Sequence, residues 1–423
     1  MKRAIRRDQL TSRLNLLWIG LGLFMFGYAQ PDIILFSPAA GLLSRITQLG
    51  GIIVYAAIIS ALKPSANEYA PTAKYFIYAL LGWQVFMFLN GDWWDLLNYT
   101  YYFDPYCYTI YLYALLFLIP TLPLMRSFFT VSRWLMLCGL PIGILLISSF
   151  ASYGAIQFAF EGFIFGAAMI VMTSKYHSRK WLYAAFGILL FGLLVAAIKA
   201  RRNLMLTDLF YLASGGYMVF FKTKGFSRTT KIFAILSLIS VGLLGAGFFI
   251  MNSSGMFASL VARAGENTRE YVFLYYFWDM LQTPIDMIIG RGMRGAYECA
   301  GVVDAGLENL RQNVENGYLQ LMLKGGVIYI IMYLTLFVMA IHRGWKSQNQ
   351  FCKTAIIILL VQIFDMLFFG LHAVNLKTFM IWMCASACLS GNISQMTDEE
   401  LLDELSEKKL LLPKWDVPKT MDQ

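Results

Sequence analysis

Residues 318–341 read YLQLMLKGGVIYIIMYLTLFVMAI, and this stretch decides the fold class. It is long enough to cross the roughly 30 Å hydrocarbon core of a bilayer as one helix, which takes about 17 to 25 residues. Lys324 is its only charged residue, and Arg343 and Lys346 follow directly. An apolar segment with basic residues at one end is typical of a transmembrane helix whose basic end stays in the cytoplasm.

The rest of the chain has the same character. Its 423 residues are 58% hydrophobic and 14% charged, which is too apolar for a soluble protein. We therefore predict an all-α, polytopic transmembrane helix bundle of about twelve spans. The predicted spans are 14–30, 47–62, 75–90, 106–125, 134–152, 156–173, 181–198, 204–221, 232–251, 318–341, 354–371 and 377–391.

Basic residues orient these spans, because Lys and Arg near span ends are retained in the cytoplasm. Simple alternation from a basic N-terminus places every second connection inside, and each of these is basic. They carry Lys63/Lys74, Arg126/Arg133, Lys175/Arg179/Lys180, Lys222/Lys224/Arg228/Lys231 and Arg343/Lys346/Lys353. The chain then divides into spans 1–9 (1–251), a large extracytoplasmic loop (252–317), spans 10–12 (318–391) and a cytoplasmic tail (392–423). Orientation explains the net charge of +9, and no motif indicates nucleic-acid binding.

Several cations fall on the side that this rule disfavours. Three lie in the short outer turn before residue 204, and the others lie in the large loop. They are Lys199, Arg201, Arg202, Arg263, Arg269, Arg291, Arg294 and Arg311. Guanidinium groups suit bidentate contacts to phosphate oxygens, so these residues indicate an anionic ligand outside the membrane. The alternative is that the loop arginines pair with loop carboxylates such as Asp286 and Glu298.

The large loop has two recognisable segments. Residues 271–281 form an amphipathic, aromatic run that suits a helix at the bilayer interface, and Pro284 should end it. Residues 290–295 read GRGMRG, and their glycines permit either a close backbone approach to a ligand or a tight turn.

Carboxylates also occur in unusual places. Glu161, Asp208 and Asp365 interrupt apolar runs, where a charge must face the protein interior or a wet cavity. They favour either a proton-coupled carrier or simple pairing with cations such as Lys199 or Arg201. Asp92 and Asp95 lie in an aromatic outer turn that suits sugar binding or an interfacial belt. The scattered histidines give no metal spacing, and no cofactor is expected.

The segment before residue 318 carries a family resemblance. Glu315-Asn316 is followed by nine residues, Gly326, two residues and Tyr329, and Pro284 to Gly292 forms a Pro-x-x-x-x-x-Gly-x-Gly stretch earlier in the loop. In this order and spacing the chain resembles the O-antigen polymerase and O-antigen ligase superfamily of bacterial inner-membrane glycosyltransferases. Ligases have His-Asn where this chain has Glu-Asn, and this difference favours a polymerase.

The resemblance implies a reaction on the periplasmic face. A glycan is transferred from undecaprenyl pyrophosphate to an acceptor sugar hydroxyl, without a metal. Arg201, Arg202, Arg263 and Arg269 would stabilise the leaving pyrophosphate. Glu315 would be the general base, or would merely hold an arginine in place.

The remaining candidates have secondary roles. Alternative bases are His372, Asp92 and Asp95, and Lys199, Arg291, Arg294, Arg311, Asn316 and Tyr318 are secondary site residues. The expected partners are the lipid-linked donor, the glycan acceptor, the lipid bilayer and, as a further candidate, a chain-length regulator. Two other functions stay open: a ligase that transfers glycan to lipid A-core, and a flippase or proton-coupled transporter of lipid-linked sugars.

Overall fold

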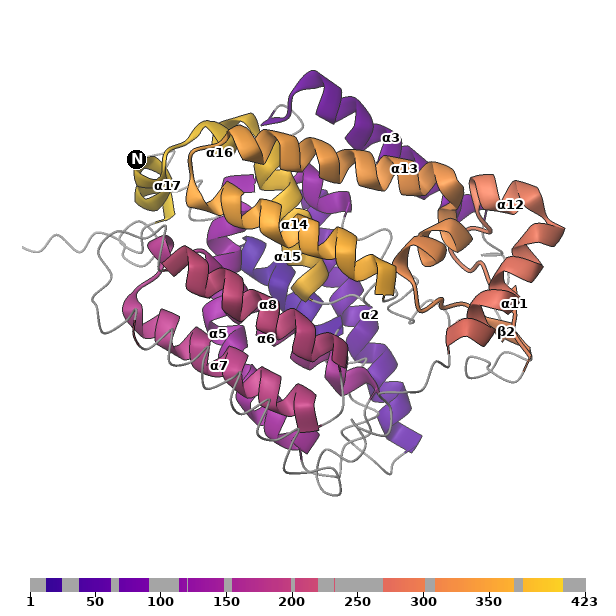
Figure 1. Cartoon of the computed structure of the whole chain (residues 1–423), viewed down its shortest axis with the longest axis horizontal. Coiled ribbons are helices and arrows are strands. Elements are labelled where there is room, and N and C mark those ends of the chain that lie inside the picture. The colour runs from indigo at the N-terminus through magenta and orange to yellow at the C-terminus, as the bar shows by residue number, and fades with distance from the viewer. Residues whose placement is uncertain are drawn as a thin grey trace, which may run out of the picture.

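The computed structural model describes residues 13–24, 38–61, 68–90, 114–119, 121–147, 154–198, 202–219, 232, 269–300, 309–368 and 376–405. These residues fold as an all-α membrane protein, with one ribbon of two short strands, β1 (Tyr297–Glu298) and β2 (Leu310–Arg311). Figure 1 shows most helices packed side by side, with the ribbon and two short helices at one end.

Nine of the described helices are apolar. Five are long and apolar enough to cross a membrane, and four are shorter. The five are α3 (Pro71–Leu89), α5 (Thr121–Ile147), α7 (Arg179–Ile198), α13 (Gly317–Lys346) and α14 (Gln350–Phe368). The shorter ones are Arg13–Phe24 and parts or all of α2 (Pro38–Ala61), α6 (Gly154–Met172) and α15 (Leu376–Leu389). A further helix, α8 (Arg202–Tyr217), packs on α6 and α7.

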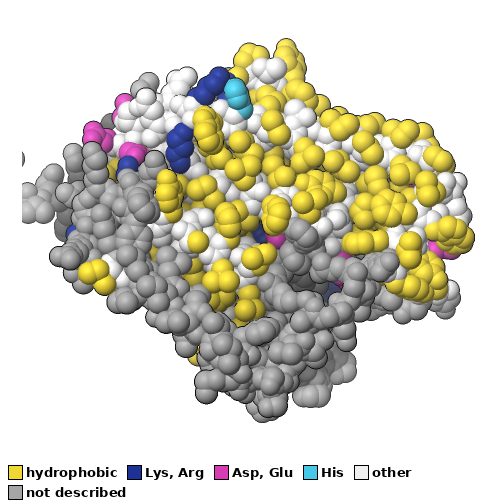
Figure 2. Space-filling model, viewed as in Figure 1, with side chains coloured by type: hydrophobic (Ala, Val, Ile, Leu, Met, Phe, Trp, Pro, Cys, Tyr) yellow, Lys and Arg dark blue, Asp and Glu magenta, His cyan; other side chains and the backbone are white. Residues whose placement is uncertain are grey.

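Large apolar side chains remain exposed along these helices, including Ile53, Trp134, Val338 and Phe364. Figure 2 shows hydrophobic side chains spread over the face that α13 and α14 present. A water-soluble protein rarely exposes so large an apolar surface, whereas lipid-facing helices require it. The predicted membrane class therefore agrees with the structure, while the predicted span 232–251 lies outside the described residues except for Ile232.

Two predicted boundaries are wrong. The connection expected at 126–133 between two spans lies inside α5, which runs without interruption from Thr121. A short 3-10 helix, Ala114–Leu118, precedes α5, which therefore begins before the predicted start of a span at residue 134. Arg126 lies within α5, and its guanidinium donates to the carboxylate and the backbone carbonyl of Glu404. The second boundary is that of α2, which begins at Pro38 rather than at residue 47.

The helix α13 is broken, which its sequence did not predict. Gly326 has φ 71° and ψ −178°, so the segment 317–325 and the spanning segment 327–346 are separate helices joined at a kink. A Cβ atom at position 326 would lie 1.9 Å from the carbonyl oxygen of Ile288. Glycine is required there both for its left-handed φ and for the close contact.

One end of the bundle, which we call the basic end, gathers three of the connections predicted to lie inside. Lys175 contacts Asp398, the Arg343 guanidinium donates to the Leu389 carbonyl at 2.6 Å, and Tyr69 pairs with Ser390 in an isolated β-bridge. Arg126 of α5 lies at the same end, where it contacts Glu404. The helices α11 (Arg269–Gln282) and α12 (Pro284–Ile289) and the ribbon lie at the opposite end, the loop end (Figure 1).

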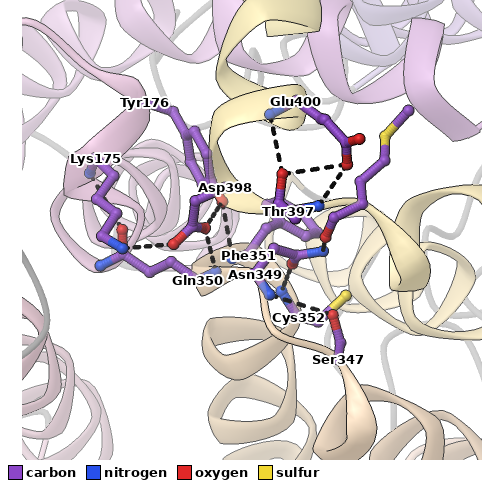
Figure 3. Close-up of polar contacts among 11 residues, drawn as sticks. Lys175, Tyr176, Ser347, Asn349, Gln350, Phe351, Cys352, Thr397, Asp398 and Glu400 are labelled. Atoms are coloured by element: carbon purple, nitrogen blue, oxygen red, sulfur yellow. Dashed lines mark hydrogen bonds and ion pairs between the residues drawn. The ribbon is translucent and has the colours of Figure 1, made fainter.

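The helix α17 (Asp398–Leu405) closes the basic end. Thr397 and Glu400 form a reciprocal capping box, as the pattern Thr-x-x-Glu indicates. Figure 3 shows Asp398 accepting from Lys175, from the Tyr176 hydroxyl at 2.6 Å and from the Gln350 amide at 2.6 Å. Burial would raise the pKa of Asp398, but these hydrogen bonds outweigh it and lower the pKa below its usual value.

We expect Gly326→Ala to prevent stable folding, because the alanine would need a left-handed φ and would overlap the Ile288 carbonyl. The strain of the φ angle alone is about 1–3 kcal/mol. The measurement is the yield of monodisperse, detergent-solubilised protein and its melting temperature. Gly82→Ala in α3 is the control, because nothing lies within 4 Å of its added Cβ. A normal melting temperature for Gly326→Ala would mean that the kink is not required.

We expect Asp398→Asn to loosen α17 by about 1 kcal/mol at neutral pH, a modest amount because the pair is partly exposed. Hydrogen exchange of α17 amides should then be about fivefold faster than in wild type. Because the folded pKa of Asp398 is lowered, its stabilisation is present above the unfolded pKa of about 3.9 and is lost as the pH falls through the folded pKa. The difference from wild type should therefore shrink below about pH 4.

Glu399→Gln removes an exposed charge one residue away and should leave this exchange unchanged. Equal exchange in Asp398→Asn and wild type at pH 7 would contradict a docking role for Asp398.

Candidate functional site

The candidate site begins where the loop re-enters the bundle, at residues 309–316. Asn309 has φ 56° and directly precedes β2, whose Arg311 pairs with Tyr297 of β1. The Arg311 guanidinium donates to a carboxylate oxygen of Glu315 at 3.2 Å. The Arg311 side chain is 11% exposed and that of Glu315 is 44% exposed. A mostly buried cation therefore holds a carboxylate that remains open to solvent.

Asn316, the next motif residue, fixes the start of α13. Its side-chain oxygen accepts from the amides of Tyr318 and Leu319 at 3.0 and 3.1 Å, which is an N-cap. Its side-chain amide donates to the Leu367 carbonyl of α14 at 2.7 Å. Tyr318 adds a second link, because its hydroxyl donates to the Ile363 carbonyl at 2.7 Å. Both secondary candidates therefore anchor α13 onto α14 and set the position of Glu315.

The glycine-rich segment 290–295 packs against the break in α13. The amide of Arg291 donates to the Leu323 carbonyl at 2.8 Å, and that of Gly292 donates to the Lys324 carbonyl at 3.0 Å. A Cβ at Gly290 would lie 2.4 Å from the Gly325 amide nitrogen. The glycines do permit a close backbone approach, but the partner in the structure is α13 itself.

The end of α3 completes this junction. The Trp83 indole donates to the Gly325 carbonyl at 2.9 Å, and the Gln84 side chain donates to the Tyr329 hydroxyl at 2.8 Å. The Met293 amide donates to the Met87 carbonyl at 3.0 Å. Tyr329, the last residue of the motif, is 1% exposed. Gly326 and Tyr329 thus have roles in the fold, as Asn316 does.

Arg291 has a structural role as well. Its guanidinium contacts the Asp279 carboxylate and donates to Asp286 at 2.8 Å, to Thr283 at 2.9 Å and to the Ala296 carbonyl at 2.8 Å. Burial would lower the pKa of Arg291, but the two carboxylates raise it overall. The alternative that loop arginines pair with loop carboxylates therefore applies to Arg291.

The remaining predicted site residues are not brought together by the described residues. Arg294 lies half-buried in the glycine-rich segment. Arg202 and Arg269 are the first residues of α8 and α11, but their side chains are not described. Six others lie outside the described residues. These are Lys199, Arg201, Arg263, His372, Asp92 and Asp95.

The sequence did not predict one ion pair that lies near the site. Lys377 donates to Asp365 at 2.8 Å, and their side chains are 3% and 7% exposed. The ammonium also lies 4.5 Å from the centre of the Phe165 ring. The sequence indicated Lys199 or Arg201 as a partner for Asp365, and not Lys377. The signal was available, because a lysine within the apolar run 376–389 must find a partner or a wet cavity. Asp208 is buried against Gly192, and the side chain of Glu161 is not described.

No protein-family model matches this chain, and no curated protein matches it. The resemblance to the O-antigen enzymes therefore rests on motif order and spacing. Three of the four motif residues, Asn316, Gly326 and Tyr329, have roles in the fold. The side chain of the fourth, Glu315, is partly exposed to solvent.

We expect Arg291→Gln to destabilise the folded protein by about 2–3 kcal/mol, because Asp279 would keep a nearly buried charge without its cation. The measurement is the melting temperature in detergent, with Glu298→Gln, an exposed charge of the same loop, as the control. Normal stability together with lost activity would instead indicate that Arg291 binds the substrate.

Proposed function

We propose that this protein is a polysaccharide polymerase that transfers glycan from undecaprenyl pyrophosphate to an acceptor sugar hydroxyl. The observation that carries the proposal is the Arg311–Glu315 pair. Its carboxylate is 44% exposed at the start of α13, while Asn316, Gly326 and Tyr329 are used by the fold. A general base must reach the proton that it removes, so an accessible carboxylate held by a fixed cation fits this role.

Orientation supports the same proposal. The basic end gathers three of the connections predicted to lie inside, together with Arg126 of α5, and the positive-inside rule then favours a cytoplasmic position for it and an extracytoplasmic position for the loop end. In a bacterium with an outer membrane, the loop end would then face the periplasm from the inner membrane. Lipid-linked glycans for O-antigen or capsule are presented on that side.

The proposed chemistry is a single displacement. The acceptor hydroxyl oxygen bonds to the anomeric carbon of the donor, and the bond from that carbon to the pyrophosphate oxygen breaks. The hydroxyl proton passes to Glu315, and undecaprenyl pyrophosphate leaves with its electron pair. Arg311 orients the carboxylate at 3.2 Å. Arg201, Arg202, Arg263 and Arg269 remain the predicted donors to the leaving group.

The same chemistry with lipid A-core as the acceptor would make the protein a ligase. A carrier of lipid-linked sugars is the candidate from another class, and two observations favour it. The helix α13 is broken at Gly326, at one end of its spanning segment, and a buried ion pair joins Asp365 to Lys377. Broken helices and buried charges are common in transporters.

We expect Glu315→Gln to abolish chain elongation, with a rate loss on the order of 10²–10⁴ as for removal of a general base. The measurement is a gel of surface and lipid-linked polysaccharide from the native host lacking the gene and complemented with each variant. Protein abundance should be normal, because the side chain is partly exposed. Glu298→Gln is the matched control, an exposed glutamate of β1, and should restore wild-type chains.

The pattern on the gel separates the candidates. Single repeat units on lipid A-core indicate a lost polymerase, and long chains left on undecaprenyl pyrophosphate indicate a lost ligase. If Glu315→Gln restores the wild-type polysaccharide pattern and Asp365→Asn does not, the enzyme is contradicted and the carrier is favoured.

A further inference from the structure

The helices α11 and α12 carry their apolar side chains on the outside. Leu274, Trp278, Leu281, Ile285 and Ile288 are each between 50% and 65% exposed. We call these five residues the apolar stripe. Leu274, Trp278 and Leu281 lie at intervals of four and three and share one face of α11, and Ile285 and Ile288, three apart, share one face of α12.

The opposite face of α11 is buried and includes a charged residue. Val272, Tyr276 and Met280 pack against the loop ribbon and the 317–325 segment in a small core that includes Tyr297 and Leu323. Asp279 lies on this inner side at 9% exposure and contacts Arg291. A helix on a water-exposed surface carries polar or charged side chains on its outer face, whereas the outer face of α11 is apolar. The ion pair and the small core also prevent α11 from turning the stripe inward.

The stripe lies at a depth that lipid can reach. From His342, at the basic end of α13, to Gly326 the chain rises about 24 Å, at about 1.5 Å per residue. The hydrocarbon core is roughly 30 Å thick, so Gly326 lies near its far boundary. Since α12 touches this position through Ile288, whose carbonyl packs on Gly326, α12 is near the same boundary.

The stripe is also continuous with surfaces that lipid must cover. Val85 and Leu89 are exposed on the last turns of α3, and Ile331 is exposed on α13 just past the kink. Figure 2 shows hydrophobic side chains extending from α13 over the end where Figure 1 places α11 and α12. A lipid-facing surface thus extends from the spans onto the loop helices.

We infer that the apolar stripe of α11 and α12 is immersed in the bilayer leaflet at the loop end, with lipid acyl chains as its occupant. The two helices are then part of the membrane domain rather than a cap in the aqueous phase. Their position in the leaflet also fixes the position, along the bilayer normal, of the glycine-rich segment, which packs on the kink of α13. The inference does not depend on the proposed reaction, since it concerns only where these helices lie.

The test is site-specific photocrosslinking in the full-length protein, reconstituted in phosphatidylethanolamine and phosphatidylglycerol vesicles. The photoreactive residue p-benzoylphenylalanine replaces Leu281 or Ile285. Val338, exposed on the spanning part of α13, is the positive control, and Glu298, exposed on β1, is the negative control. Intact-mass spectrometry then measures lipid adducts, and gel electrophoresis measures crosslinked dimers.

We expect lipid adducts at positions 281 and 285 in yields comparable to position 338 and several-fold above position 298. Adducts no more abundant than at position 298 would show that the stripe faces water, and a crosslinked dimer would show that a second copy covers it. Either result overturns the inference. Brominated lipids give a second measurement on the native side chain, because they should quench wild-type fluorescence more than that of Trp278→Phe.

Discussion

The arrangement at the loop end depends on one constraint, the break of α13 at Gly326. Backbone groups in or near hydrocarbon must be hydrogen-bonded within the protein, because no water is available to them. The carbonyls of Leu323 and Lys324, just before the break, accept from the amides of Arg291 and Gly292. The glycine-rich segment is therefore required by the helix that follows it in sequence. This requirement brings the large loop down onto the spans.

That contact determines where the proposed chemistry would occur. Because the 317–325 segment is not collinear with the spanning part of α13, its first residues can reach the end of α14, where Asn316 and Tyr318 are anchored. Glu315 precedes this anchor, and Arg311, on the ribbon, sets the direction of its carboxylate. The buried Asp365–Lys377 pair joins the adjoining ends of α14 and α15 one residue before Met366, against which Gly317 packs. The proposed base is thus held by the adjoining ribbon and, through Asn316 and Tyr318, by α14, which is distant in sequence.

The two ends of the molecule use charge differently. At the basic end, Lys175, Arg126 and the amide of Gln350 meet the acidic helix α17, so cations retained by topology also bind the tail. At the loop end, Arg291 and Arg311 pair with carboxylates of their own loop. If the stripe on α11 and α12 lies in lipid, the ion pairs of Arg291 sit on the protein side of helices whose other side is apolar. Pairing is what permits charge at that depth.

The sequence by itself determined the membrane class, the helical character of apolar runs such as 181–198 and 318–341, and the helix at 271–281 with its end at Pro284. These follow from composition and local periodicity, which a chain carries wherever it is placed. It also singled out Glu315 by motif spacing, although it could not say which motif residues serve the fold. Only the tertiary structure decided that Gly326 breaks α13, that Arg291 belongs to Asp279 and Asp286, and that Asp365 pairs with Lys377. Such pairings join residues of different elements, and the helix packing that selects among many possible cations and carboxylates is not a local property of the sequence.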